Sequence, residues 1–260
     1  MGIITFTSDL GNKDFYVSAV KGKILSLNPD AQIIDISHEI EKFNIIEAAF
    51  NVKNIIKDFP EKTVHIISVL PEATETSPHL ICEYKKQYFI ASDNGIFSLI
   101  FESNPDKIIE PVITYDSDST TFPTKDIFAK IAAHLSKGGK PEDLGGIRDS
   151  YLERTTFLPV YSENFIQGTV IYIDSYGNLF TNITQRLFED VRNKRRFTIL
   201  IRGKEYRISS ISKSYNDVPS GEIVALFSDT GYLEIANNLG NASNLLGLQK
   251  NDTIRIEFEQ

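Results

Sequence analysis

The pattern of apolar residues changes once along this 260-residue chain, near residues 153–167, and that change constrains the fold more than any other feature. Before it, short apolar runs that predict strands alternate with i, i+3, i+4 stripes that predict helices. The predicted strands are 3–7, 33–36, 63–69 and 87–91, and the helical stripes lie within 17–27, 45–59 and 128–135. This alternation favours a mostly parallel sheet that is covered by helices.

After the change, the chain is rich in strands alone. Strand-like runs lie at 169–173, 197–201, 205–208, 222–227, 232–236 and 253–258, and only 185–191 has a helical pattern. Short strands separated by turns are typical of a small antiparallel barrel or sandwich. We therefore predict an α/β N-terminal domain over residues 1–155 and a small antiparallel β-barrel domain over residues 165–260.

Composition excludes several classes of function. Acidic residues outnumber basic ones by 35 to 27, and the net charge of −8 argues against general binding to nucleic acid or to anionic membranes. No apolar stretch of the sequence approaches the roughly 20 residues of a membrane-spanning helix. The single cysteine, Cys82, excludes an intrachain disulfide and a zinc site built from cysteines. We expect a cytoplasmic protein with no metal, no membrane partner and no nucleic-acid partner.

A carboxylate follows the first predicted strand. Ser8-Asp9-Leu10-Gly11 lies at the C-terminal end of that strand, which is the edge where open α/β sheets bind ligands. Asp9 is suited there to accept hydrogen bonds from a ribose diol, or else to cap the helix that begins near Asp14. The loop lacks the glycine-rich patterns of dinucleotide and phosphate sites, so it predicts no cradle for a polyphosphate.

A second polar and aromatic cluster lies in the strand-rich part of the chain. Tyr176 and Phe180 are suited to stack on a flat heterocycle. Asn178 is suited to read the hydrogen-bonding edge of that ring, and Asp174 to pair with an ammonium group. The alternative is a hairpin turn at Gly177 with the aromatic rings in the core. The residues alone do not decide between the two interpretations.

Six segments, in their order along the chain, match the motifs of one known family. They are Thr7-Ser8-Asp9-Leu10-Gly11, Asp35-Ile36-Ser37-His38, the turn Asp93-Asn94-Gly95, Asp126-Ile127-Phe128-Ala129, Ile173-Asp174 with Gly177-Asn178 and Thr181-Asn182-Ile183, and the segment from Gly231 to Asn238. Together they resemble the S-adenosyl-L-methionine (SAM) hydroxide adenosyltransferases, whose relatives include the SAM-dependent fluorinase and chlorinase. Each motif is weak alone, but their joint order spans nearly the whole chain.

The resemblance implies an α/β N-terminal domain, a small β-barrel, and a homotrimer. In such a trimer, SAM lies between the N-terminal domain of one subunit and the C-terminal domain of the next. SAM is the substrate or ligand, and no further cofactor is implied. The implied contacts are Asp9 to the ribose diol, Phe43 near the ribose, Asp174 to the methionine ammonium, Tyr176 stacked on adenine, Asn178 at the adenine edge, Phe180 beside it, and Ser228 and Asp229 near the methionine end.

The sequence differs from the family's pattern at the positions that are implied to carry out the reaction. The family's reaction is an in-line displacement at C5′ of the ribose, in which water, hydroxide or a halide attacks and neutral methionine leaves. The hydrolytic members orient the water with an aspartate, an arginine and a histidine. This chain has Leu70, Ser77 and Pro123 at those positions. The halogenases have a tyrosine at the Leu70 position, so the chain departs from them as well.

Three interpretations remain open at this point. The protein hydrolyses SAM through substitute residues, or it binds an adenosyl compound without turnover as a sensor or buffer, or its pocket serves another nucleophile. The candidate substitutes are Glu72, Glu75, Thr76, Ser77, His79 and Lys125. We expect SAM or adenosine to bind, because the residues at the family's binding positions, Asp9, Asp174, Tyr176 and Asn178, are present. We expect hydrolysis to be weak or absent, because Leu70, Ser77 and Pro123 cannot polarise water and acid–base assistance is worth roughly 10²–10⁴ in rate.

Overall fold

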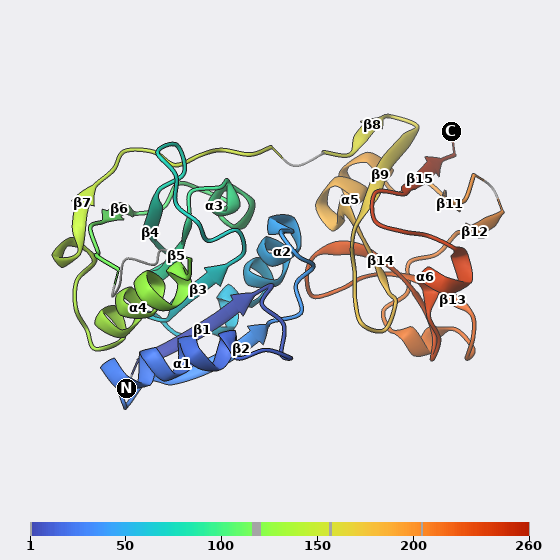
Figure 1. Ribbon diagram of the computed structural model, residues 1–260. Coiled ribbons are helices and arrows are strands. Elements are labelled where there is room, and N and C mark those ends of the chain that lie inside the picture. The colour runs from blue at the N-terminus through green and yellow to red at the C-terminus, as the bar shows by residue number, and fades with distance from the viewer. Residues whose placement is uncertain (1, 116–120, 156–157, 204, 260) are drawn as a thin grey trace. The chain divides into compact units, whose positions relative to one another are not determined.

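The computed structural model describes residues 2–115, 121–155, 158–203 and 205–259 (Figure 1). The chain divides into two compact units, Met1–Thr155 and Thr156–Gln260, and each unit has its own hydrophobic core. Among the described residues, no helix is both long enough and apolar enough to cross a membrane.

The first unit is built on a seven-stranded mixed sheet with the order β2-β1-β3-β5-β4-β6-β7. Its strands are β1 (Ile3–Ser8), β2 (Gln32–Ser37), β3 (Val64–Ser68), β4 (His79–Tyr84), β5 (Gln87–Ser92), β6 (Lys107–Pro111) and β7 (Gly145–Ile147). The strands β2, β1, β3 and β5 pair in parallel, whereas β4, β6 and β7 continue the sheet in antiparallel fashion. The predicted mostly parallel sheet is thereby confirmed.

Helices cover both faces of this sheet (Figure 1). They are α1 (Tyr16–Leu27), α2 (Ile45–Ile55) with the 3-10 turn η1 (Ile56–Asp58), α3 (Ile96–Ile100), the π-helical turn η2 (Thr124–Phe128) that leads into α4 (Ala129–Ser136), and the 3-10 turn η3 (Pro141–Asp143). Side chains alternate between the two faces of a strand. Accordingly, Val64 and Ile66 of β3 pack with α1 and α4, while Ile67 packs with α2 and α3.

The sequence pattern did not predict the strands β4, β6 and β7. The chain reverses between β4 and β5 at Lys85 and Lys86, whose φ angles are 49° and 60°. Two-residue hairpin turns with positive φ are normally signalled by Asn-Gly or Asp-Gly. Two lysines give no such signal, so the hairpin was not recognised.

The second unit is an antiparallel sheet with the order β12-β11-β15-β9-β10-β14-β13, and β8 pairs with β9. Its strands are β8 (Val160–Ser162), β9 (Phe165–Ile173), β10 (Leu179–Thr184), β11 (Phe197–Ile201), β12 (Tyr206–Ile208), β13 (Ile223–Phe227), β14 (Tyr232–Asn237) and β15 (Thr253–Phe258). The two end strands, β12 and β13, lie in contact, so the sheet forms a nearly closed barrel. This confirms the predicted fold of the C-terminal part.

Short helical segments accompany the barrel. They are α5 (Gln185–Arg192), the 3-10 turn η4 (Tyr215–Asp217) and α6 (Ala242–Leu246). The helix α5 was predicted, but the expectation that no other segment is helical was wrong, because α6 forms after β14. Asn241 caps α6 by accepting a hydrogen bond from the Asn244 amide at 2.7 Å. A five-residue helix is too short to show a helical period in the sequence.

Candidate functional site

A cavity of about 360 Å³ opens in the first unit beyond the C-terminal ends of β1 and β3. It is lined by Asp9, Leu10, Asp14, Tyr16, Lys42, Phe43, Leu70, Pro71, Glu72, Thr121, Phe122, Pro123 and Thr124. Two predicted binding residues, Asp9 and Phe43, therefore share one cavity with Leu70 and Pro123. This is the sheet edge at which α/β folds bind ligands.

Asp9 is buried in the cavity wall and is held there by the loop that precedes α2. Its Oδ2 accepts a hydrogen bond from the Phe43 amide at 2.8 Å, and the Lys42 ammonium donates to its backbone carbonyl. The interpretation of Asp9 as a helix cap is wrong, because Phe15 occupies the N-cap position of α1. A fixed carboxylate in a concave wall is suited to accept hydrogen bonds from vicinal hydroxyl groups.

Phe43 lies at the rim of the cavity with 68% of its surface exposed. Its φ of 66° lies in the left-handed region, which is unfavourable for a bulky side chain. This conformation accompanies the hydrogen bond from the Phe43 amide to Asp9. Lys42 could not be predicted from the sequence, because its contact is to the backbone carbonyl of Asp9.

The loop after β3 supplies Leu70, Pro71 and Glu72 to the cavity lining. Leu70 has a φ of 50° and is 37% exposed, and the Asn94 amide donates to the carbonyls of Val69 and Leu70 at 3.0 and 3.2 Å. His79 lies 2.8 Å from the Pro71 carbonyl through Nε2. Since a carbonyl only accepts, Nε2 carries the proton in this contact. Asn94, recognised in the sequence only as part of a turn, therefore positions the wall around Leu70.

In the second unit, the predicted cluster around Asp174 folds as one tight turn between β9 and β10. Asp174 Oδ1 accepts from the amides of Tyr176 and Asn178 at 3.0 and 2.8 Å, and its Oδ2 accepts from the Asn178 side chain at 3.0 Å. The Tyr176 ring is 76% exposed, whereas Asn178 and Phe180 are buried. Of the two aromatic residues, Phe180 thus lies in the core, and Tyr176 is presented on the surface.

Gly177 is required by this turn for two reasons. Its φ of 84° is in the left-handed region, and a Cβ at this position would lie 2.2 Å from the Asn241 side chain. In addition, its carbonyl accepts from the Ser243 amide of α6 at 2.9 Å. The turn is consequently packed against α6, far along the chain.

Ser228 and Asp229 lie between β13 and β14, where Ser228 Oγ is 2.8 Å from Thr230 Oγ1 and Asp229 is exposed. Nearby in the same unit, Tyr215 donates to the fully buried Glu234 at 2.8 Å. Burial raises the pKa of Glu234, and the charge of Asp174 raises it further. Sequence reasoning missed this carboxyl group because it lies within a strand that reads as core.

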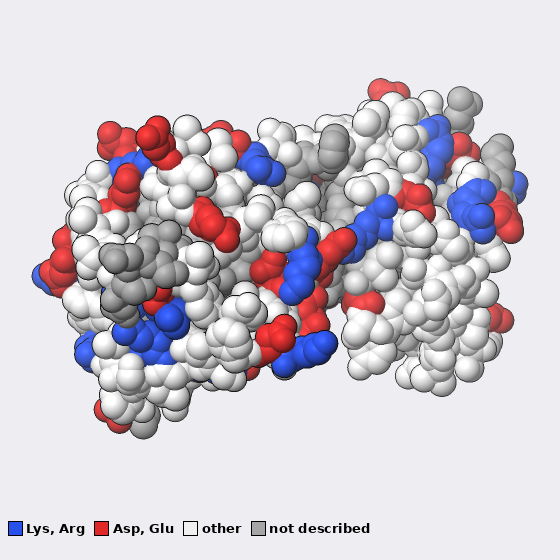
Figure 2. All heavy atoms as spheres, in the orientation of Figure 1, with Lys and Arg blue, Asp and Glu red and all other residues white. Residues whose placement is uncertain are grey.

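The described part of the chain contains no group of three or more His, Cys, Asp or Glu side chains arranged to hold a metal ion. On the face shown in Figure 2, Lys and Arg residues lie among Asp and Glu residues.

Comparison with known protein families decides the class. The model of the SAM hydroxide adenosyltransferase N-terminal domain matches residues 4–145, and that of the C-terminal domain matches residues 168–255. The chain belongs to the SAM hydroxide adenosyltransferase family. The resemblance seen in the sequence motifs is thus confirmed over both parts of the chain.

Relatives within this family extend over almost the full chain. An (R)-S-adenosyl-L-methionine hydrolase of Methanocaldococcus jannaschii is 32% identical and covers 99% of this chain and 97% of its own length. A fluorinase of Actinopolyspora mzabensis is 24% identical over 98% of this chain and 96% of its own. A crystal structure of an uncharacterized conserved protein from Thermotoga maritima matches with a TM-score of 0.89 and 34% identity, over 97% of this chain and 99% of that one.

Two of the three residues that differ from the family's expected water-handling residues, Leu70 and Pro123, lie in the cavity lining. The third, Ser77, pairs with Thr74 in a small hairpin. At the floor, the buried Thr124 Oγ1 lies 2.6 Å from Ser68 Oγ. Neither leucine nor proline has a side-chain group that donates or accepts a hydrogen bond, so these two side chains cannot polarise a water molecule.

The candidate substitutes lie in different environments. Glu72 lines the cavity, while Glu75 and Thr76 are exposed within the Thr74–Ser77 hairpin. Lys125 forms an ion pair with Asp126 at 3.4 Å and also lies over the Phe122 ring. His79 is buried, and that burial lowers its pKa. Glu72 is therefore the substitute whose place in the structure best suits a role at the cavity.

Proposed function

We propose that this family member binds SAM or a related adenosyl compound and hydrolyses SAM at ribose C5′ with low activity. The observation that carries the proposal is the composition of one cavity. Asp9 and Phe43 lie in its wall, and so do Leu70 and Pro123 in place of the residues that handle water. The residues proposed to bind the ligand thus match the family pattern, whereas the residues expected to orient water do not.

The proposed contacts follow the family pattern. Asp9 accepts from the ribose diol, and Phe43 packs near the ribose. In the second unit, Asp174 meets the methionine ammonium, Tyr176 stacks on adenine, Asn178 reads its edge, Phe180 packs beside it, and Ser228 and Asp229 lie near the methionine end. The high exposure of the Phe43 and Tyr176 rings, 68% and 76%, supports these roles, since an exposed aromatic ring is available to a ligand.

The proposed reaction needs no general acid at the leaving group. The sulfonium of SAM is already a good leaving group, because methionine departs without charge. The protein must hold C5′ in line with the nucleophile and remove competing solvent. Glu72 is the proposed general base for an attacking water, because its side chain lines the cavity.

The second candidate function is binding without turnover, as a sensor of SAM or of a nucleoside. The apolar wall formed by Leu70 and Pro123 favours it, because an attacking water gains no polarising contact there. Loss of acid–base assistance alone slows a reaction by roughly 10²–10⁴.

Two measurements test these proposals. Calorimetry with SAM and adenosine at up to millimolar concentration should show binding to the wild type and much weaker binding to Asp9→Asn; no heat with either compound contradicts the proposed binding. Chromatography of an overnight SAM incubation should then show slow formation of adenosine and methionine. Rapid turnover contradicts low activity, and bound but unchanged SAM supports the sensor function.

The role of Glu72 has a matched control in the same loop. Glu72→Gln should remove the residual hydrolysis while leaving adenosine binding within about threefold. Glu75→Gln makes the same chemical change in the exposed hairpin outside the cavity lining and should leave the rate unchanged. Equal rates in the wild type and Glu72→Gln would exclude Glu72 as the base.

We also propose that the protein is a homotrimer whose sites are shared between subunits. The support is the family membership and the division of the proposed binding residues between two compact units. Light scattering should give three times the 29.3 kDa chain mass. A monomer mass contradicts both the trimer and the shared site.

A further inference from the structure

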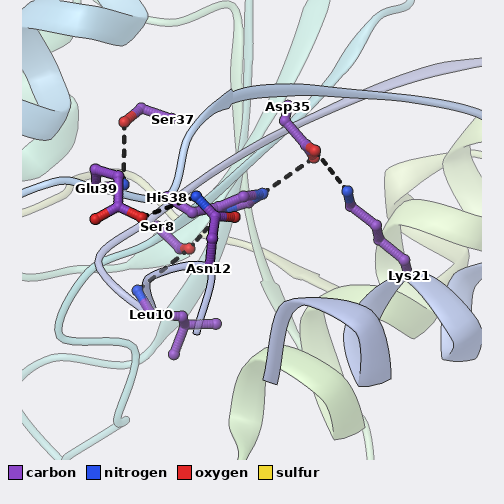
Figure 3. Close-up of polar contacts among 8 residues, drawn as sticks. All are labelled: Ser8, Leu10, Asn12, Lys21, Asp35, Ser37, His38 and Glu39. Atoms are coloured by element: carbon purple, nitrogen blue, oxygen red, sulfur yellow. Dashed lines mark hydrogen bonds and ion pairs between the residues drawn. The ribbon is translucent and has the colours of Figure 1, made fainter. Parts of the chain in front are cut away.

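A chain of polar side chains connects the protein surface to the segment that carries Asp9 (Figure 3). The Lys21 ammonium pairs with Oδ2 of Asp35, and Oδ1 of Asp35 lies 3.0 Å from Nε2 of His38. On the other side of the imidazole, Nδ1 lies 2.7 Å from Ser8 Oγ. Ser8 Oγ in turn accepts from the Leu10 amide at 3.4 Å. Ser8 and His38 are both buried.

The donor and acceptor roles along this series of polar side chains follow from the charge of Asp35, which lies at its outer end. Partial burial raises the pKa of Asp35, but the interactions with Lys21 and His38 outweigh burial and lower that pKa below its usual value. Oδ1 of Asp35 lies 3.0 Å from Nε2 without the alignment of a full hydrogen bond. Because an ionised carboxylate repels a nitrogen lone pair at this distance, the contact favours a proton on Nε2. With the proton of a neutral imidazole on Nε2, Nδ1 is an acceptor, and the Ser8 hydroxyl is the donor of the 2.7 Å contact to it. Ser8 Oγ keeps its lone pairs for the Leu10 amide.

This constellation does not form a nucleophilic triad. In serine hydrolases, Nε2 contacts the serine and Nδ1 contacts the carboxylate, whereas here the two nitrogens have exchanged partners. The Ser8 side chain is also fully buried, with 0% of its residue surface exposed. The Ser8 hydroxyl is thus closed off from solvent, and its polar contacts are to His38 and to the Leu10 amide.

His38 holds the Asp9 segment from both ends. Its ring contacts Ser8, the residue before Asp9, and its backbone carbonyl accepts from the Gly11 amide at 2.7 Å. The Phe6 ring packs edge-on against the imidazole at 4.7 Å and fixes its plane. Asn12 donates to Glu39 at 2.8 Å and ties the same two loops together. The orientation of the imidazole therefore affects the backbone on which Asp9 is mounted.

We propose that His38 is a positioning residue for Asp9 and that Asp35 selects the Nε2–H tautomer that this role requires. The effect on ligand affinity rests on the proposed function of Asp9 in binding the ribose. The effect on the protein does not, because the conformation of residues 8–11 can be measured without ligand.

Asp35→Asn tests the proposal because the Lys21 ammonium determines the orientation of the new side-chain amide. The carbonyl oxygen of the amide turns to the Lys21 ammonium, so its NH2 group faces His38 Nε2. The imidazole must then carry its proton on Nδ1, and Ser8 loses its acceptor inside a buried site. We expect adenosine to bind about tenfold more weakly and amide hydrogen exchange at residues 9–12 to accelerate. The ring 15N shifts of His38, measured at pH 8, should report the change of tautomer.

A second substitution should reverse these effects. In Lys21→Met/Asp35→Asn, nothing holds the amide oxygen outward, so the amide turns and accepts from Nε2–H. Tautomer, exchange rates and affinity should return to within about twofold of the wild type. Asp143→Asn is the matched control, because Asp143 lies 3.3 Å from the more exposed His134, away from the cavity. This control should change none of the three measurements at residues 8–12 and His38.

The outcomes separate this proposal from the proposed function. An unchanged His38 tautomer in Asp35→Asn overturns the role of Asp35, and a changed tautomer with unchanged exchange at 9–12 overturns the role of His38. A wild type that binds neither SAM nor adenosine overturns the proposed function, while accelerated exchange in Asp35→Asn still supports positioning. If Asp35→Asn does not fold, Ser8→Ala removes the inner end of the chain and should accelerate the same amides without changing the tautomer.

Discussion

Replacing Leu70 by aspartate places a carboxylate in the apolar wall of the cavity, at the position where hydrolytic relatives are expected to have one. The backbone is already suited to the change. Leu70 has a φ of 50°, a conformation that aspartate and asparagine adopt more readily than leucine. The Asn94 side chain holds the loop through backbone carbonyls and does not depend on the residue type at position 70.

The expected change in stability is small. Full burial of a leucine side chain is worth about 1.5–3 kcal/mol. Leu70 is 37% exposed, so its loss costs about 1–2 kcal/mol. Relief of the left-handed backbone offsets about 1 kcal/mol of that cost. We therefore expect a net loss of about 1 kcal/mol or less and a folded Leu70→Asp variant.

The expected change in rate is larger. General acid–base assistance is worth roughly 10²–10⁴, and Leu70→Asp supplies one of the three missing groups. We expect SAM hydrolysis to rise at least roughly tenfold, and to rise further in Leu70→Asp/Pro123→His.

Initial rates of adenosine formation, measured by chromatography at saturating SAM, check this expectation. Leu70→Asn is the matched control, because it has the same backbone preference and nearly the same size without the charge. The reasoning is refuted if Leu70→Asp binds adenosine with wild-type affinity and hydrolyses SAM no faster than Leu70→Asn.

Two further predictions concern stability. Burial lowers the pKa of His65 from 6.5 to about 4, and its neutral ring bridges Thr5 at 2.7 Å and Gln87 at 2.9 Å. The unfolded chain therefore binds the proton first as pH falls, and the free energy of unfolding should drop by about 3 kcal/mol between pH 8 and pH 4.5. Urea titrations should show that His65→Gln lacks this part of the pH dependence. Gly177→Ala should lower the free energy of unfolding by about 2 kcal/mol or more, because φ is 84° and the added Cβ meets Asn241; an unchanged urea midpoint contradicts the close packing.

The sequence predicted the parts of the fold in which side-chain pattern and backbone geometry agree. Strands buried on both faces, such as β1 and β3, read as continuous apolar runs. The β4–β5 hairpin was missed because two lysines adopt positive φ in its turn, and tertiary contacts stabilise that conformation. The helix α6 was missed because its cap and its packing on Gly177 replace the periodicity of a longer helix.

Residues of the candidate site could be predicted only where they belong to a sequence motif of the family. Asp9 and Phe43 come from the resemblance, and the structure brings both into one cavity. Lys42 and Asn94 act on backbone carbonyls, a type of contact that no residue pattern encodes. The competing interpretation of Asp9 as a helix cap was wrong because a segment 34 residues away supplies its hydrogen-bond donor.

The position of β15 in the sheet affects how the second unit can fold during synthesis. The last strand of the chain lies in the interior of the second sheet, between β9 and β11, which are themselves joined through it. During synthesis the first unit emerges before the second, and the second lacks this interior strand until Thr253–Phe258 have left the ribosome. A nascent or truncated chain that ends before β15 therefore exposes two unpaired strand edges and the apolar interior of the barrel. Chaperones and proteases are expected to act on such chains until β15 has paired with β9 and β11.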